Sequence, residues 1–492
     1  MSRLKKIFAG CFLAFLALAG ATKVSGQDEP QQQQPQQPPE SAPSPAGHST
    51  PIPAMDSDIQ DNNPNQGNQV QPDDTPLTGM LSPTLGAPEV THSYWVAGLQ
   101  YSSSVQTTGF GSSGWFAYNY FGGNFSLLEA GSHSKFVVNY TGGGYFDTGG
   151  GGFGSFQGVS LAQSFKFRRW SFQIADSFSY LPQSSYGFGG GTNLGTPGVG
   201  GSTGTTLPGI NNGYLPNQSV YGGLGPEYNN TGVIQGTYAL SSRSSITASA
   251  AYGILHFIDP GFVDTDSIYA GFGYSYVLSP KDTIGIVYNF GSYHFPGDPQ
   301  AFGDQIVSLA YSRKITGRLA LSLYGGPQYT SYRVPIGTAT NQLGGYASAS
   351  LSYALENGGL SVSYSHGLSG GGGLLTGSTL DQVYGGATRK LTRIWEGHVN
   401  FGYAHNAAIG STAIIGNPNY FYNPNYASWY IGGGLNRPFG RYMTFGVAYT
   451  ASISTYNLNG ACPGTTCGPA SNSLYQTVTA NIQWHTRPFV LH

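Results

Sequence analysis

From Thr91 onward, the sequence is dominated by a two-residue alternation of apolar side chains with small or polar ones. The segment 443–454 shows this alternation most clearly. Because successive residues of a strand point to opposite faces, the period predicts β-strands with one apolar face and one small, polar face. In segment 443–454 the apolar face consists of Met443, Phe445, Val447, Tyr449, Ala451 and Ile453.

The polar faces of these predicted strands carry almost no charge. Asp, Glu, Lys and Arg make up 9% of the chain, against about 25% of an average soluble domain. The polar faces carry mainly Ser, Gly, Thr, Asn and Gln, whereas a soluble sandwich would expose Lys, Glu and Arg. An apolar face toward lipid and a polar face toward a watery lumen are typical of a transmembrane β-barrel. A net charge of −2 gives no basic surface for nucleic acid, and three cysteines exclude a disulfide scaffold.

The pattern predicts an all-β, antiparallel, up-and-down barrel of about 18 strands, although 16 strands also fit it. Predicted connections alternate between short turns and longer loops, so both ends of the barrel lie on the short-turn side. Fifteen of the sixteen Lys and Arg residues beyond the leader lie at or near short turns, and only Arg333 lies on a long loop. The predicted strands cover residues 93–106, 115–128, 134–146, 155–167, 170–182, 231–241, 244–256, 266–278, 282–294, 303–314, 318–331, 342–355, 359–368, 379–390, 394–406, 426–437, 441–455 and 472–485.

The region before the barrel divides into a leader and an acidic segment. Residues 1–26 have a basic start, an apolar run and small residues between Ala21 and Gly26, which predicts a secretory signal peptide cleaved in that interval. Residues 27–91 are rich in Gln and Pro and contain nine acidic residues but no Lys or Arg. This composition predicts a disordered segment. We hypothesise that its charge draws it to the basic short-turn side of the barrel.

The leader, the alternating strands, the short turns and a last strand ending in Ile482 and Trp484 together resemble a bacterial outer-membrane β-barrel of the porin-like kind. The resemblance covers residues 92–486 and leaves 487–492 as a short tail. It implies outer-membrane lipid and the barrel-assembly machinery as partners, periplasmic termini, and passive diffusion of small solutes through the lumen. It implies no enzyme activity, cofactor or metal. Two alternatives stay open: a non-conducting structural or adhesive surface barrel, and a secreted Gly/Tyr-rich β-fibre.

Residues 183–230 form the longest predicted outer loop. In porins the corresponding third loop commonly folds inward and narrows the channel, and here Glu227 is its only charged residue. An ion-selective constriction usually needs rings of charge, so an inward fold would favour neutral, sugar-like solutes. A surface loop outside the lumen is the alternative. The candidate solute contacts are Tyr186, Phe188, Tyr214, Tyr221, Glu227 and Tyr228.

One predicted strand carries ionisable side chains on its polar face. Glu396, His398 and Asn400 alternate with apolar residues, which predicts that they point into the lumen, with Lys390 across the adjoining turn. An acid and an imidazole can exchange protons, but no Ser or Cys nucleophile accompanies them. We therefore interpret these residues as polar lumen lining rather than as a catalytic site.

Two polar residues interrupt a predicted lipid face. Gln163 and Asp176 are in register with apolar residues, and pairing across the turn at Arg168 and Arg169 makes them diagonal neighbours. We hypothesise that they mark a surface that meets a second copy in a homo-oligomer. The alternative is a β-bulge that turns one of them inward.

The remaining candidates lie on outer loops. Cys462 and Cys467 are the only cysteines beyond the leader, and in an oxidising compartment they are expected to form a disulfide. Acidic residues on two other loops offer oxygen ligands for calcium, but their spacing matches no calcium-binding motif, so we expect no metal site. These acidic residues are Asp259, Asp264, Asp266, Asp298 and Asp304.

Overall fold

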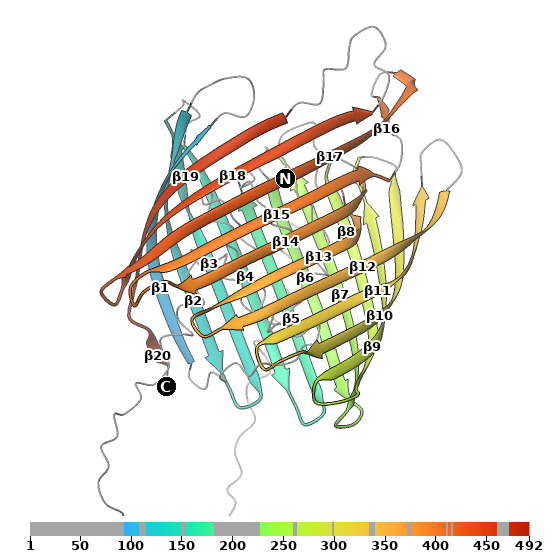
Figure 1. Cartoon of the computed structure of the whole chain (residues 1–492), viewed down its shortest axis with the longest axis horizontal. Coiled ribbons are helices and arrows are strands. Elements are labelled where there is room, and N and C mark those ends of the chain that lie inside the picture. The colour runs from blue at the N-terminus through green and yellow to red at the C-terminus, as the bar shows by residue number, and fades with distance from the viewer. Residues whose placement is uncertain are drawn as a thin grey trace, which may run out of the picture. The chain divides into compact units, whose positions relative to one another are not determined.

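The computed structural model describes the chain from residue 93 to 491 with gaps, and the described residues form one closed antiparallel sheet (Figure 1). Each long strand pairs with its neighbours in sequence, and β1 pairs with β19, which closes the sheet into an up-and-down barrel. The described residues are 93–107, 115–148, 153–181, 227–258, 263–297, 300–333, 340–370, 376–409, 412–414, 417–459 and 472–491.

Eighteen long strands form the barrel wall, and two three-residue strands are added to it. The strands are β1 (Ser93–Thr107), β2 (Trp115–Ala130), β3 (Ser134–Asp147), β4 (Phe153–Lys166), β5 (Trp170–Leu181), β6 (Glu227–Ala239), β7 (Ser244–Phe257), β8 (Thr265–Val277), β9 (Asp282–His294), β10 (Ala301–Lys314), β11 (Leu319–Arg333), β12 (Thr340–Leu355), β13 (Gly358–Ser369), β14 (Ser378–Lys390), β15 (Glu396–Ala408), β16 (Thr412–Ile414), β17 (Asn417–Phe439), β18 (Met443–Asn459), β19 (Asn472–His485) and β20 (Phe489–Leu491).

The eighteen predicted strands are therefore confirmed, although several boundaries differ, and two differences stand out. Strand β17 begins at Asn417, well before the predicted residue 426, because its outer end forms a hairpin with β16. This extension shows no clear two-residue alternation, so the sequence pattern missed it. The second difference follows the last long strand, where β20 pairs with the start of β1 and the Trp95 and Phe489 rings stack at 4.2 Å.

The predicted alternation becomes an outer and an inner face of the wall. On β10, Ile306, Ser308 and Ala310 are buried on the lumen side, while Val307 and Leu309 are 48% and 69% exposed on the outside. The same division holds on β18, where Val447 and Ile453 are exposed and Ser452 is buried. An apolar outer face and a polar inner face define a transmembrane β-barrel.

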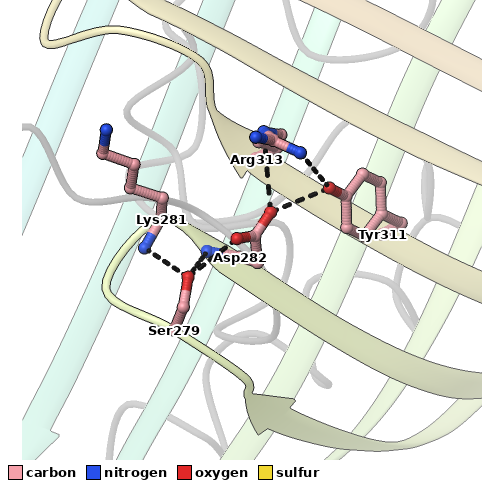
Figure 2. A network of polar contacts seen from close by, with 5 residues as sticks. All are labelled: Ser279, Lys281, Asp282, Tyr311 and Arg313. Carbon is pink, nitrogen blue, oxygen red and sulfur yellow. Dashed lines mark hydrogen bonds and ion pairs between the residues drawn. The ribbon is translucent and has the colours of Figure 1, made fainter.

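Four of the short turns share one hydrogen-bonding pattern that the sequence encodes. A Ser or Thr hydroxyl accepts two backbone N–H groups, those of the second and third residues after it. In the turn between β8 and β9, Ser279 Oγ accepts from the N–H groups of Lys281 and Asp282 at 3.1 Å each (Figure 2). This local bond satisfies backbone donors that a tight turn leaves unpaired. The capping residues of the four turns are Ser241, Ser279, Thr316 and Thr392.

Figure 2 also shows how the outer face ends at this rim. The Asp282 carboxylate accepts the Tyr311 hydroxyl at 2.8 Å and lies 3.7 Å from Arg313 Nε. All three residues are in register with exposed apolar residues of β9 and β10. The network therefore places a tyrosine and an arginine at the edge of the apolar band, where aromatic and basic groups are suited to the membrane interface.

A belt of tyrosines marks the outer face near the loop end. In five outer hairpins, a tyrosine hydroxyl on the first strand donates to a carboxamide or carboxylate oxygen on the second strand, two residues nearer the loop. Asp176 occupies the corresponding position of the β5–β6 hairpin, where it accepts from Asn230 Nδ2 at 3.2 Å. The five pairs are Tyr101–Asn119, Tyr140–Gln157, Tyr288–Gln305, Tyr364–Asp381 and Tyr449–Gln476.

Candidate functional site

The candidate site is the lumen, whose described wall carries many hydroxyl and carboxamide groups and few charged side chains over its central part. Strands β12 and β13 illustrate this, because six serines face one another across them. Their side chains offer hydroxyl groups that both donate and accept hydrogen bonds. The cross-strand pairs are Ser348↔Ser365, Ser350↔Ser363 and Ser352↔Ser361.

Charged side chains on the lumen face gather at the strand ends. At the short-turn end, four lysines lie on the same strand faces as buried lumen residues. Lys135 shares its face with Asn139, and Lys390 with Thr388. At the loop end, Glu227 lies in the lumen register of β6. The four lysines are Lys135, Lys166, Lys314 and Lys390.

A buried aromatic cluster lines the lumen at the loop end of β9 to β11. Tyr293 and Phe302 stack at 4.3 Å and are 1% and 2% exposed. Gly370 directly follows β13, and Gly377 directly precedes β14, in the connection between these two strands. A methyl group at Gly370 would lie 3.3 Å from the Tyr293 ring, and one at Gly377 would lie 2.6 Å from the Phe302 ring. Both ends of this connection therefore turn inward over strands four positions away in the wall.

Hydrogen bonds connect the β13–β14 connection to the wall in this same region of the outer mouth. The Gln300 side-chain oxygen accepts the hydroxyls of Thr376 and Tyr332 at 2.6 and 2.5 Å, which ties the inward connection to β11. Farther from the loops, both oxygens of the Asp304 carboxylate lie 3.0 Å from Gln328 Nε2. Asp304 is 6% exposed and lies on the lumen face. It is the one carboxylate of the described lumen wall that lies away from the strand ends.

The predicted lumen residues of β14 and β15 lie in one register. Lys390 is directly opposite Glu396, and His398 and Asn400 follow on the same face of β15. Two glycines of β17 make room for them, because a methyl group at Gly432 would lie 2.4 Å from Asn400 Oδ1 and one at Gly434 would lie 2.6 Å from the His398 ring. The wall is therefore closely packed around these side chains.

Glu227 and Tyr228, expected on the long loop, are instead the first two residues of β6 and point to opposite sides of the wall. Glu227 has the lumen register, whereas Tyr228 stacks on the outward-facing Tyr180 at 5.0 Å. The other loop candidates, Tyr186, Phe188, Tyr214 and Tyr221, and both cysteines, Cys462 and Cys467, lie outside the described residues.

Gln163 and Asp176 both lie in the outward register that the sequence predicts. Leu161 pairs directly with Asp176, and Gln163 pairs with Ile174, so the two polar residues are diagonal neighbours. Asn230 of β6 joins them, because its side chain donates to Asp176 and to the Ser177 carbonyl, each at 3.2 Å. Asn230 was not singled out from the sequence, since its partner lies 54 residues away across the longest loop.

The calcium candidates do not come together in the described part of the chain. Asp264 accepts the backbone N–H of Phe257 and contacts His256 Nδ1 at 2.6 Å, while Asp304 lies in the lumen. No group of three or more His, Cys, Asp and Glu side chains among the described residues can hold a metal ion. Asp259 and Asp298 lie outside these residues. Within the described segments, no helix is long and apolar enough to cross a membrane.

Comparison with known proteins finds similar solved structures of low sequence identity. OpdQ of Pseudomonas aeruginosa shares 10% identity over 81% of this chain and 100% of its own, with a TM-score of 0.39. OpdK of the same organism, solved with vanillate, shares 9% identity over 80% and 99%, with a TM-score of 0.42. OccAB3 of Acinetobacter baumannii shares 10% over 80% and 99%, with a TM-score of 0.39. No protein-family model and no curated protein matches the chain.

Proposed function

We propose that this protein is an outer-membrane channel through which small, uncharged polar solutes diffuse passively. The observation that carries the proposal is the closed barrel of eighteen long strands, whose described lumen wall has serine hydroxyls on β12 and β13 and a single carboxylate, Asp304, away from the strand ends. Barrels of about 16 to 18 strands enclose an aqueous channel unless another segment fills them. Channels for ions use rings of charged side chains, and the described central wall has none. Sugar-like solutes suit serine hydroxyls and carboxamides.

Buried polar groups of the lumen wall support the same proposal. Asn400 is 1% exposed, and neither its oxygen nor its nitrogen has a hydrogen-bond partner among the described residues. The two polar side-chain atoms of Gln100 are likewise unpaired. Unpaired buried polar groups are rare in folded proteins because each costs free energy. Water bound within the polar lumen wall would satisfy them.

The proposed orientation places the short turns and both ends of the barrel in the periplasm. Short periplasmic turns and longer outer loops are the usual arrangement of these barrels. With this orientation, outer-membrane lipid covers the apolar face, and insertion requires the barrel-assembly machinery. Protease treatment of intact cells tests the orientation, because a tag inserted between Ser132 and His133 is expected to be protected until the outer membrane is permeabilised.

The experiment that tests the channel is single-channel conductance of the signal-cleaved protein in a planar bilayer. Discrete current steps that are blocked by sucrose or a maltooligosaccharide are the expected result. Silence from protein whose barrel is shown to be folded would reject the channel and favour the alternative, a non-conducting surface barrel. Steps that neutral sugars do not reduce would reject the sugar-like solute class while leaving the channel in place.

We further propose that the outer face around Gln163 and Asp176 contacts a second copy of the chain. The carboxylate interrupts the tyrosine belt, and charged side chains on a lipid face are unfavourable. In a two-fold pair, Gln163 of one copy can donate to Asp176 of the other. Asp176→Leu is expected to lower the oligomer mass measured in mild detergent. An unchanged mass would reject this contact; Leu309→Ala, at an exposed outward-facing position of β10, is the control.

A further inference from the structure

Asp304 of β10 is a buried carboxylate whose described partners carry no positive charge. It is 6% exposed, and its two oxygens accept from Gln328 Nε2 at 3.0 Å each and from the backbone N–H of Gln305. In the described part of the chain, no Lys, Arg or His forms an ion pair with it. Buried charges in proteins are normally paired, because an isolated charge loses its hydration without compensation. The surroundings of Asp304 therefore favour a cation beside its carboxylate.

The basic side chains of the neighbouring strands do not supply that cation. His294 of β9 and Arg333 of β11 lie at the same loop end as Asp304, but both are exposed on the outer face. Lys314 lies on the lumen face at the opposite end of β10, about 33 Å away along the strand. Within the described residues of β9, β10 and β11, a positive charge beside Asp304 has to come from a molecule in the lumen.

A small niche beside Asp304 is left by a glycine, and we call it the Gly291 niche. Gly291 of β9 pairs directly with Asp304 on one side and with Tyr269 of β8 on the other. A methyl group at Gly291 would lie 3.4 Å from Tyr269 Cε1 and 3.6 Å from Tyr293 Cε2. It would lie 3.7 Å from Asp304 Cβ, so each approach is an ordinary contact rather than an overlap. The niche therefore accepts a group of methyl or ammonium size.

Asn289 adds a second acceptor beside the niche. It lies two residues from Gly291 on the same lumen face and pairs with Ile306, so it is a diagonal neighbour of Asp304. The Asn289 side-chain oxygen is buried and has no hydrogen-bond partner among the described residues. The niche thus brings together a carboxylate with uncharged partners and an amide oxygen that lacks a donor.

We propose that the Gly291 niche, with Asp304 and Asn289, binds the ammonium group of a small, hydroxyl-bearing organic cation. An ammonium group has three N–H donors, no acceptor and a positive charge, which matches the carboxylate and the unpaired amide oxygen. The hydroxyl groups of such a solute suit the serines of β12 and β13. The proposal goes beyond the passage of uncharged solutes and rests on the channel only because a ligand must reach the lumen.

The binding is tested with two probes that differ in one group. Glucamine carries an ammonium group at about pH 7.5, well below the pKa of an alkylamine, and sorbitol has a hydroxyl in its place. Ligand-observed NMR measures their affinities for the full mature protein folded in octyl tetraethylene glycol micelles. Glucamine is expected to bind at least about tenfold more tightly than sorbitol, because hydrogen bonds between charged groups are the stronger kind.

Two variants locate the bound ammonium group. Asp304→Asn keeps the shape but removes the charge, and it is expected to raise the Kd of glucamine at least about tenfold and leave that of sorbitol unchanged. Gly291→Ala fills the niche and is expected to raise the Kd of glucamine at least about threefold. Gly345→Ala, on the outer face of β12 with no atom within 4 Å of the added methyl group, is the control.

The outcomes that would overturn the proposal are distinct. Equal affinity of the unmodified protein for both probes would reject the cation site and leave water in the niche. Unchanged glucamine affinity in Asp304→Asn would place the cation elsewhere. If Asp304→Asn does not fold, as judged by heat-dependent mobility in electrophoresis, Gly291→Ala decides, and unchanged glucamine affinity in that variant would reject the site.

Single-channel currents separate this site from the channel function. Glucamine is expected to interrupt the current for longer than sorbitol, and Asp304→Asn is expected to remove the difference. If the protein does not conduct but still binds glucamine in an Asp304-dependent way, the channel fails and the site stands. If the protein conducts and neither probe responds to Asp304→Asn, the channel stands and the site fails.

Discussion

The assignment of inner and outer faces predicts opposite outcomes for one substitution at adjacent residues of β13. Val362 and Ser363 lie at the middle of this strand. Val362 shares its face with Leu360 and Tyr364, which are 42% and 38% exposed on the outer wall. Ser363 lies opposite Ser350 on the lumen side. Arginine is therefore expected to meet hydrocarbon at position 362 and a polar lumen at position 363.

The magnitude follows from the depth of the two positions. Arg on the lipid face costs about 2–4 kcal/mol at the midplane and about 0–1 kcal/mol near the interfaces. Val362→Arg should then lower the folding equilibrium constant roughly 30- to 700-fold, at about 1.4 kcal/mol for each factor of ten. Ser363→Arg should change the free energy of unfolding by less than about 0.5 kcal/mol. Arg389, outward-facing at the end of neighbouring β14, shows that the same side chain occurs at the rim.

The assay is urea-dependent unfolding in phosphatidylcholine vesicles, followed by the fluorescence of the tryptophans. Val362→Ala is the matched control, since it removes the apolar side chain without adding charge. The face assignment would be refuted if Ser363→Arg lost as much stability as Val362→Arg. It would also be refuted if Val362→Arg cost no more than Val362→Ala.

Three further substitutions test contacts within the wall. Ser279→Ala removes the acceptor of two turn N–H groups and is expected to lower the free energy of unfolding by about 1 kcal/mol. Ser279→Thr keeps the acceptor and is the control. Equal stability of the two variants in the urea assay would contradict the role of Ser279 in the turn. Tyr140→Phe removes the 2.8 Å hydrogen bond to Gln157 in the tyrosine belt. The expected loss in the free energy of unfolding is about 0.5–1.5 kcal/mol. A double-mutant cycle with Gln157→Leu that shows no coupling energy would argue against the hydrogen bond. Gly434→Ala would place a methyl group 2.6 Å from the His398 ring and is expected to lower the free energy of unfolding by about 1–3 kcal/mol. Gly345→Ala is the control and is expected to be neutral, because no atom lies within 4 Å of the added methyl group. Equal stability of the two variants would show that the wall relaxes at Gly434.

Strand positions were predictable because each strand repeats one physical requirement along its length. A residue such as Leu309 must face lipid and its neighbour Ser308 must face the lumen, so apolar and polar residues alternate along the sequence. The outer mouth was not predictable in this way. The packing of Gly370 on Tyr293 joins strands that are distant in the chain, and no local period encodes it. Asp304 was considered as a loop residue, although the predicted strand 303–314 contains it in register with Ser308; its place on the lumen face follows from that register, and β10 begins two residues earlier, at Ala301.

The strand register alone determines which face of the wall carries each of the basic residues of β10 and β14. Once β10 and β14 are fixed by their apolar residues, the faces of Arg313, Lys314, Arg389 and Lys390 follow without further information, because a one-residue shift would exchange them. Guanidinium groups suit a membrane edge, where they bind aromatic rings and phosphate, and ammonium groups are strongly hydrated. At the short-turn ends of β10 and β14, the Arg-Lys order therefore places the guanidinium at the membrane edge and the ammonium group in the watery lumen. The reverse order would place the more hydrated cation against lipid, so the dipeptide order is itself evidence for the register.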